Sequence, residues 1–338
     1  MKILTYNEID KKQWQELIEA SATATWFQTD EAYQFYASVS EMVPFATAVE
    51  NNGELRAVCV GYTTQETNTI KQYLTCRAII IGGPLLADDA TNEEVAPLIE
   101  AVTNTSRLSP FASRPIYIET RNFHDYSRWK AVFESNGFAY QPHLNFHVNT
   151  TTTEIAQGNI GKHRWKYIRL SMRDGAKIVQ QPTIEQVRAF YTILQDLYRT
   201  KVRTPLWSWD FFERLYYIEN AKYILVELDG KIVGGAACVC LPGKALYEWY
   251  ACGLDNCRDD IRPTSVAIWG EIQYAAENGY PLFDFMGAGK PDEPYGVRDF
   301  KAEFGGELVE YGRFLCIRKP LLYWIGKWGV KWLKRNIK

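Results

Sequence analysis

The sequence of 338 residues lacks the features that mark membrane-spanning, secreted or broadly nucleic-acid-binding proteins. No apolar run approaches the ~20 residues that a transmembrane helix requires. The opening stretch MKILTYNEIDKKQW turns charged before a signal-peptide core is reached. We therefore expect a cytoplasmic protein. A net charge of -2 argues against a general nucleic-acid binder but leaves room for local basic patches.

Metal-ligand patterns are also missing. The chain has four histidines and seven cysteines, and an odd number of cysteines fits reduced thiols better than a disulfide framework. Cys252 and Cys257 lack histidine partners at metal-site spacing, and we expect His143 and His147 on a strand without shared ligand geometry. The sequence predicts no metal, and no Cys/His or Ser/His arrangement predicts a covalent intermediate.

What the sequence contains is a similar order of elements in its two halves. Asn52-Gly53 and Asp229-Gly230 each separate two apolar runs, which is a strong hairpin signal. Periodicity predicts helices near 14–18, 33–39 and 92–103 and strands at 45–50, 55–62, 77–81 and 115–119. The second half repeats this order with helices at 184–198 and 264–278 and strands at 223–227, 232–239, 245–252 and 281–285.

This repetition predicts an α/β (α+β) protein built from two copies of one unit. Each unit is expected to hold a mixed, mainly antiparallel sheet flanked by helices. We place the units at 1–150 and 151–317, joined by a linker near 149–161, where threonines and glycines gather. A basic, aromatic tail, 318–338, follows.

Lys301 stands out because it lies between Phe300 and Phe304, directly before Gly305-Gly306. A charged lysine in an apolar setting is costly unless a carboxylate or an anionic ligand compensates it. Upstream, Asp284 interrupts the apolar stretch 281–285 with a single carboxylate.

Four segments carry a family resemblance: Trp26-Phe-Gln-Thr29, the basic stretch 162–169 with Arg173-Asp-Gly175, the strand 281–285, and Phe300-Lys-Ala-Glu-Phe-Gly-Gly306. They resemble the Fem-type (FemAB-like) aminoacyltransferases, a branch with the GNAT acyltransferase fold. The resemblance covers most of the chain and implies two tandem GNAT-like domains. It also implies transfer of an activated aminoacyl group onto an amine of a cell-envelope precursor, in a peptidoglycan or envelope polysaccharide pathway. The paired-helix arm of the staphylococcal-type members has no counterpart here.

The donor expected from the resemblance is aminoacyl-tRNA, with no bound cofactor. Ordinary GNAT enzymes hold the coenzyme A diphosphate on backbone N–H groups of a glycine-containing loop. The corresponding stretch, Cys257-Arg-Asp-Asp-Ile-Arg-Pro-Thr264, has no glycine and two acidic residues. Two alternatives stay open: an acyl-CoA-dependent N-acetyl- or N-acyltransferase acting on an amino sugar, and a non-catalytic envelope-assembly scaffold.

The resemblance associates Lys301 with the aminoacyl donor, and an ammonium near the reacting carbonyl would stabilise an oxyanion. Alternatively its stem packs between Phe300 and Phe304 while its head reaches water. Asp284 is expected to orient or deprotonate the acceptor amine; otherwise it is a buried carboxylate that holds Lys301 or backbone N–H groups. Glu248 is the alternative base. Phe300 is expected in the channel wall and Phe304 in the substrate site.

Cations at helical spacing provide candidate phosphate contacts. Lys162, Lys166, Arg169 and Arg173 recur on one face of a predicted helix, where they would meet diphosphate groups or a tRNA acceptor stem. The alternative is a solvated helix face. Arg164 and Arg298 are further phosphate candidates.

The tail 318–338 contains no acidic residue. In a helix, Lys327, Lys331, Lys334 and Lys338 fall on one side, next to a stripe of Trp324, Trp328 and Trp332. This pattern is typical of a helix in an anionic membrane interface, so we expect peripheral contact with the inner face of the membrane. The alternative is a terminal helix that packs its apolar face onto the domain.

Overall fold

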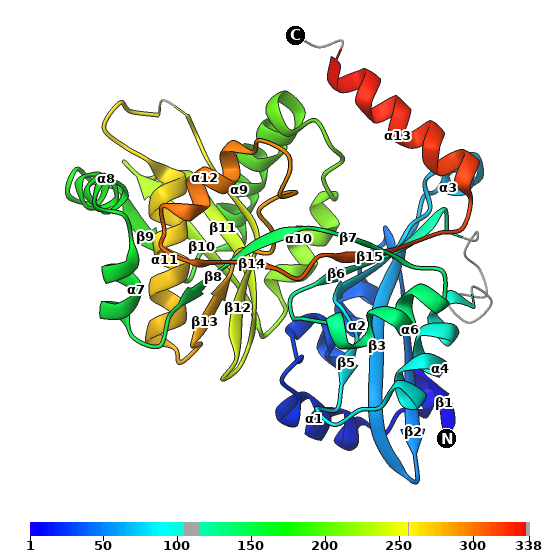
Figure 1. The fold of residues 1–338 in the computed structure, drawn as a ribbon. Helices are drawn as coiled ribbons and strands as arrows, with labels where there is room; N and C mark the ends of the chain where they lie inside the picture. The colour runs from blue at the N-terminus through cyan, green and yellow to red at the C-terminus, as the bar shows by residue number, and fades with distance from the viewer. Residues whose placement is uncertain (105–114, 256, 336–338) are drawn as a thin grey trace. The chain divides into compact units, whose positions relative to one another are not determined.

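A computed structural model describes residues 1–104, 115–255 and 257–335, with side chains described as far as Trp328. The chain forms two compact units (Figure 1). Unit 1 comprises Met1–Pro142 and Tyr311–Lys338, and unit 2 comprises His143–Glu310. Each has a mixed, mainly antiparallel sheet flanked by helices, which confirms the predicted fold class.

The sheet of unit 1 runs in the order β1-β2-β3-β4-β6-β15-β7, with the short β5 paired to β3. Only β4 and β6 are parallel among the pairs described in this sheet. Its strands are β1 (Lys2–Thr5), β2 (Met42–Asn51), β3 (Glu54–Thr64), β4 (Ala78–Gly82), β5 (Leu85–Leu86), β6 (Tyr117–Asn122), β7 (Ala139–Gln141) and β15 (Arg313–Ile317). Its helices are α1 (Lys11–Ala20), α2 (Asp30–Ser38), α3 (Thr69–Thr75), α4 (Asn92–Thr103), α6 (Lys130–Ser135) and α13 (Pro320–Arg335).

The sheet of unit 2 runs in the order β14-β8-β13-β12-β11-β10-β9. Its strands are β8 (Leu144–Asn149), β9 (Lys177–Val179), β10 (Ala221–Leu228), β11 (Lys231–Leu241), β12 (Ala245–Gly253), β13 (Leu282–Asp284) and β14 (Glu307–Glu310). Its helices are α7 (Thr153–Asn159), α8 (Lys162–Arg173), α9 (Ile184–Leu197), α10 (Trp209–Tyr216), α11 (Pro263–Glu277) and α12 (Gly296–Ala302).

Both predicted hairpin turns are present. Asn52 and Gly53 have φ of 52° and 87°, and Asp229 and Gly230 have φ of 49° and 75°. Two successive positive φ values match the twist of the flanking strands, and Asn, Asp and Gly adopt them at the lowest cost. The turns set the register of the pairs β2/β3 and β10/β11.

The core of unit 2 has a helical layer on each face of the sheet (Figure 1). On one face, Ile268 and Ile272 of α11 join Cys238 and Cys240 of β11, with α7 and α8 beside them. On the other face, α9 and α10 supply aromatic residues, such as Phe212 against Tyr250 of β12. The central helix α11 is therefore buried around most of its surface.

The two units have the same order of elements, and each contains one strand, β8 or β15, from the part of the sequence expected to form the other unit. In each, an antiparallel meander is followed by a helix and a strand parallel to the third: β2-β3-β4-α4-β6 and β10-β11-β12-α11-β13. β8 then pairs with β13 and β14, while β15 pairs with β6 and β7. The unit boundary thus falls before His143 rather than at 150, and β15 lies in unit 1 rather than in the expected second unit.

The stretch expected to be a linker, 149–161, is instead largely helical. Thr152 caps α7 by accepting a hydrogen bond from the Ile155 N–H at 3.2 Å. Ala156 and Ile160 are buried in the core of unit 2. The threonine run therefore starts a helix, because threonine favours the N-cap as much as it favours loops.

Candidate active site

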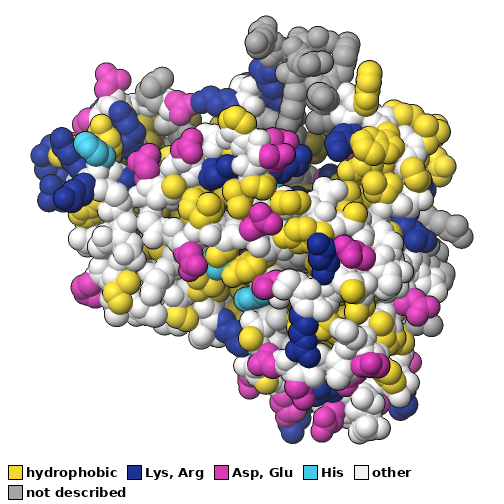
Figure 2. All heavy atoms as spheres, viewed as in Figure 1, with side chains coloured by type: hydrophobic (Ala, Val, Ile, Leu, Met, Phe, Trp, Pro, Cys, Tyr) yellow, Lys and Arg dark blue, Asp and Glu magenta, His cyan; other side chains and the backbone are white. Residues whose placement is uncertain are grey.

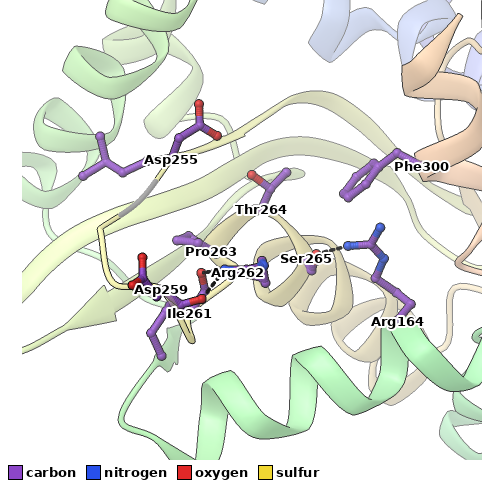
Figure 3. Close-up of a pocket in the computed structure, with 10 residues that line it drawn as sticks. Arg164, Asp255, Asp259, Ile261, Arg262, Pro263, Thr264, Ser265 and Phe300 are labelled. Atoms are coloured by element: carbon purple, nitrogen blue, oxygen red, sulfur yellow. Dashed lines mark hydrogen bonds between the residues drawn. The ribbon is translucent and has the colours of Figure 1, made fainter.

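A pocket of about 300 Å³ opens in unit 2 at the start of α11 (Figure 3). Arg164 of α8 and Phe300 of α12 line it together with Arg262–Ser265 at the beginning of α11. Asp255 and Asp259 also line it, so the pocket carries charges of both signs. Its lining includes part of the stretch 257–264, which was compared above with the coenzyme A loop of ordinary GNAT enzymes.

Arg164 is fixed at the edge of this pocket. Its guanidinium donates to Ser265 Oγ at 2.7 Å and pairs with Glu303 Oε2 at 3.1 Å. It also lies 4.4 Å from the ring centroid of Phe300, a cation–π contact. The structure thus brings together Arg164 and Phe300, two of the predicted substrate-binding residues, in a rigid arrangement.

The start of α11 offers few backbone donors to a diphosphate. Pro263 occupies the first turn and has no N–H. The Arg262 N–H already donates to Ser171 Oγ at 3.0 Å. A helix N-terminus binds anions through such N–H groups, so the first donors that an ordinary GNAT site would use are missing or occupied here.

Lys301 is paired with Glu248 of β12. Nζ lies 3.0 Å from Glu248 Oε1 and donates to the carbonyl oxygens of Phe285 and Gly287 at 2.7 and 3.1 Å. Side-chain exposures of 12% for Lys301 and 5% for Glu248 show that the pair is buried. The alternative in which the lysine head reaches water is therefore wrong, and the three partners match its three N–H donors.

The loop after β13 is held by α12. Met286, Gly287 and Gly289 have φ of 56°, 142° and 78°, a backbone path that L-residues rarely adopt. Lys301 fixes the first part of this loop. Arg298 donates to the carbonyl oxygens of Ala288 and Glu293 at 2.9 Å each, and also to that of Lys290. This geometry gives Arg298 a loop-holding role instead of the phosphate contact expected from the sequence.

Asp284 belongs to a second cluster, built with β8. It is 1% exposed, accepts from the Met286 N–H at 2.6 Å and from Asn145 Nδ2 at 2.7 Å, and lies 3.1 Å from His147 Nε2. The alternative considered from the sequence was a buried carboxylate that holds Lys301 or backbone N–H groups. Asp284 does bind a backbone N–H group, but its side-chain partners are Asn145 and His147 rather than Lys301. We missed these two residues, although a strand period of two places 143, 145 and 147 on one face.

Phe304 does not line the candidate site. It is fully buried and packs against Phe285 and Phe300 in the core of unit 2. The prediction that it contacts substrate is not supported by this position, because a side chain with no exposed surface cannot reach a ligand without rearrangement. The signature thus divides into Phe300 at the pocket and Phe304 in the core.

The basic helix is α8, as predicted. Lys162, Lys166, Arg169 and Arg173 lie on its exposed side. Arg173 pairs with the adjacent Asp174 at 2.8 Å. Arg164, on another side of the same helix, lines the pocket, whereas these four cations do not.

Glu271, on α11, was also missed. It is 0% exposed, and neither carboxylate oxygen has a hydrogen-bond partner in the described part of the chain. Burial, and then the neighbouring Glu248 carboxylate, raise the pKa of Glu271 well above its usual value. Burial also raises the pKa of Glu248, against the opposing effect of Lys301. The arrangement favours an ionised Glu248 paired with Lys301 beside a neutral Glu271.

The Glu271→Gln variant should lose part of the pH dependence of stability. The pKa of Glu271 in the folded state lies above its unfolded value of about 4.5. Below about pH 4.5 the carboxyl group is neutral in both states, and its contribution to the free energy of unfolding is complete. As the pH rises from there toward the folded-state pKa, only the unfolded state loses the proton, so the free energy of unfolding falls. The free energy of unfolding should therefore fall less steeply in the variant, by up to about 1.4 kcal/mol per pH unit. Urea unfolding at several pH values between about 5.5 and 8.5, on both sides of neutrality, measures this slope.

The matched control is Glu277→Gln, an exposed glutamate on the same helix. It should keep the wild-type slope. Parallel stability curves for wild type and Glu271→Gln would contradict a neutral buried Glu271.

Comparison with known proteins agrees with this architecture. Residues 162–301 match the family described as an acetyltransferase (GNAT) domain. The structure of FemX is similar over 96% of this chain and 99% of its own, with a TM-score of 0.70 and 14% identity. The protein has the GNAT acyltransferase fold.

Two further structures share this fold over nearly the whole chain. The similarity to the C-terminal domain of a putative lysylphosphatidylglycerol synthetase from Agrobacterium fabrum covers 95% of this chain and 95% of that domain, with a TM-score of 0.57 and 12% identity. A tandem GNAT protein from the clavulanic acid biosynthesis pathway covers 93% of this chain and 97% of its own, with a TM-score of 0.54 and 9% identity. No curated protein sequence matches significantly. The resemblance to the Fem-type group is thus confirmed at the level of the tandem GNAT fold.

Proposed function

We propose that this protein is an aminoacyltransferase that acylates an amine of a cell-envelope precursor. The observation that carries the proposal is the buried Lys301–Glu248 pair, in which the lysine directly follows Phe300, a residue that lines the pocket together with Arg164. The fold shared with FemX and with a protein named for a lysyl-lipid product supports the choice of acyl group and acceptor.

The reaction needs a stabilised oxyanion and a proton acceptor. The acceptor nitrogen forms a bond to the acyl carbon, and the bond from that carbon to the donor oxygen breaks. The proton that the amine loses is passed on to the departing oxygen, which leaves as a hydroxyl group. Lys301 supplies positive charge for the oxyanion, and Glu248, 3.0 Å from its Nζ, orients the ammonium. Direct contact with the oxyanion requires Lys301 to exchange one of its two carbonyl partners.

Asp284 acts on the proton through His147 in this proposal. At 1% exposure Asp284 cannot meet an acceptor amine, whereas the His147 side chain is 14% exposed and 3.1 Å away. Asp284 holds the imidazole in position, and His147 accepts the proton that the amine loses in this proposal. The role expected for Asp284 thereby becomes one of supporting His147.

Aminoacyl-tRNA is the proposed donor. The start of α11 offers fewer N–H groups to a coenzyme A diphosphate than an ordinary helix start, since Pro263 has none and the Arg262 N–H donates to Ser171. The exposed cations of α8, Lys162, Lys166, Arg169 and Arg173, supply contacts for the phosphates of an acceptor stem. The proposed partners are therefore tRNA and an envelope precursor with a free amine.

A second candidate function is supported by the match of 162–301 to an acetyltransferase domain. In it, the same site uses acyl-CoA to acylate an amino sugar. In a third candidate function, the protein is a scaffold without catalytic activity. A scaffold would have the same fold but would not require Lys301 for its function.

A transfer assay with two donors distinguishes these functions. Purified protein is incubated with a muropeptide precursor or an amino sugar and either aminoacyl-tRNA or acetyl-CoA. We expect product only with aminoacyl-tRNA, and loss of product in Lys301→Ala. Product from acetyl-CoA alone would favour the second candidate, and no product from any combination would favour the scaffold.

The place of action is proposed as the cytoplasmic face of the membrane. Within the residues that the structure describes, no helix is long and apolar enough to span a bilayer. The tail 318–338 is proposed to contact the membrane surface. Of its cations and tryptophans, the side chains of Lys331, Trp332, Lys334, Arg335 and Lys338 lie outside the described residues.

A further inference from the structure

Exposed apolar side chains gather on two helices of unit 1, α3 and α13. In Figure 2, hydrophobic side chains cover the surface where Figure 1 draws α3 and the start of α13. Their exposed fractions range from 48% to 78%. The members of this two-helix surface are Ile70, Tyr73, Leu74, Leu321, Trp324, Ile325 and Trp328.

In α13 the exposed stripe is distinct from the face that packs on unit 1. Leu322 and Tyr323 are half-buried, and the Tyr323 ring meets Tyr117 of β6 edge to face, with centroids 5.7 Å apart. The exposed residues recur at i, i+3, i+4 and i+7 on the other side of the helix. Packing onto the domain therefore leaves a second apolar stripe uncovered: Leu321, Trp324, Ile325 and Trp328.

The short helix α3 has no packing role that would explain its apolar residues. All seven of its residues are described, and none is buried. Ile70, Tyr73 and Leu74 recur at i, i+3 and i+4, which places them on one face. The side chain of Asn68 caps the helix by accepting from the Lys71 N–H at 3.0 Å. Among the described residues, α3 therefore presents an apolar face that remains exposed.

Lysines link and flank the two helices. Lys319, at the start of α13, places Nζ 4.0 Å from the ring centroid of Tyr73 on α3. Lys327 is exposed, and its Nζ lies 5.0 Å from the Trp324 ring. From Arg318 to Lys338 the sequence has seven cations and no acidic residue. Beside α3, Lys71 pairs with Glu66 at 2.8 Å. The surface thus combines tryptophans and aliphatic residues with an excess of positive charge that comes from the tail.

We propose that α3 and α13 together form a docking surface for an anionic phospholipid bilayer. Tryptophan and leucine would enter the interface, while exposed lysines such as Lys327 meet the headgroup phosphates. An excess of positive charge fits a membrane better than a protein partner, whose interface usually balances charges of both signs. The inference rests on the membrane contact proposed above for the tail and extends it to α3, but it does not depend on the transfer chemistry of unit 2.

Vesicle flotation of the full-length protein tests this surface. We expect binding to phosphatidylcholine–phosphatidylglycerol vesicles, little binding to phosphatidylcholine alone, and weaker binding at high salt. Trp324→Ala with Trp328→Ala should lower the partition coefficient at least about tenfold. Ile70→Ser with Leu74→Ser, on the other helix, should lower it by a similar factor, because both helices insert.

Tyr217→Ser is the matched control, since Tyr217 is 70% exposed but lies in unit 2. It should bind like wild type, and all variants should keep the wild-type melting temperature. Wild-type binding by the α3 variant would overturn the two-helix surface. Failure of wild type to bind anionic vesicles, together with a dimer that the tryptophan variant abolishes, would overturn it in favour of a second copy of the chain.

Discussion

Replacing Lys301 with alanine should reduce kcat/KM for aminoacyl transfer by about 10²–10³-fold. The variant loses the positive charge that stabilises the oxyanion. It also leaves Glu248 buried without its 3.0 Å partner, so the free energy of unfolding should fall by about 3–5 kcal/mol. Initial rates and urea unfolding measure the two effects on the same protein.

A double variant separates chemistry from folding. Lys301→Met with Glu248→Gln removes both charges, so most of the lost stability should return while transfer stays low. Lys231→Ala, at an exposed lysine of unit 2, should match wild type in both measurements. Recovery of activity along with stability in the double variant would show that Lys301 serves the fold alone.

Replacing Gly305 with alanine should destabilise the protein by at least about 3 kcal/mol. Gly305 has φ of +78°, and a Cβ there would lie 1.9 Å from the carbonyl oxygen of Asn159 at the end of α7. The first glycine of the closing signature is thus required for the close approach of two backbones. The midpoint of urea unfolding measures the loss.

Gly230→Ala provides the comparison for backbone strain alone. Its φ is +75°, nearly the same as that of Gly305, but no atom lies within 4 Å of the added Cβ. We expect a cost of about 1–2 kcal/mol there. Equal losses at the two positions would mean that the contact with Asn159 relaxes and that φ alone sets the requirement for glycine.

Local patterns in the sequence predicted much of this structure. The turns at Asn52-Gly53 and Asp229-Gly230 are present, and helix α4 has the predicted bounds of 92–103. These features depend on residues close together in the chain. The pairing of β8 within unit 2 and of β15 within unit 1 was not predicted, because local periodicity does not indicate which distant strand a segment pairs with.

The site was predicted in part for the same reason. Lys301 stood out as a charge among phenylalanines, but its partner Glu248 lies on a strand about fifty residues earlier in the chain. Asp284 was found by its apolar neighbours, whereas His147 was set aside after being considered only as a metal ligand. Glu271 gave no signal, since a glutamate in a helix normally faces water.

The mass of the acceptor after incubation with each donor tests the central claim most directly. Aminoacyl transfer predicts that the precursor gains the mass of one aminoacyl residue with aminoacyl-tRNA and nothing with acetyl-CoA. In the same incubation time, Lys301→Ala should convert only a small fraction of the precursor that wild type converts. A gain of one acetyl group from acetyl-CoA, with none from aminoacyl-tRNA, would contradict it.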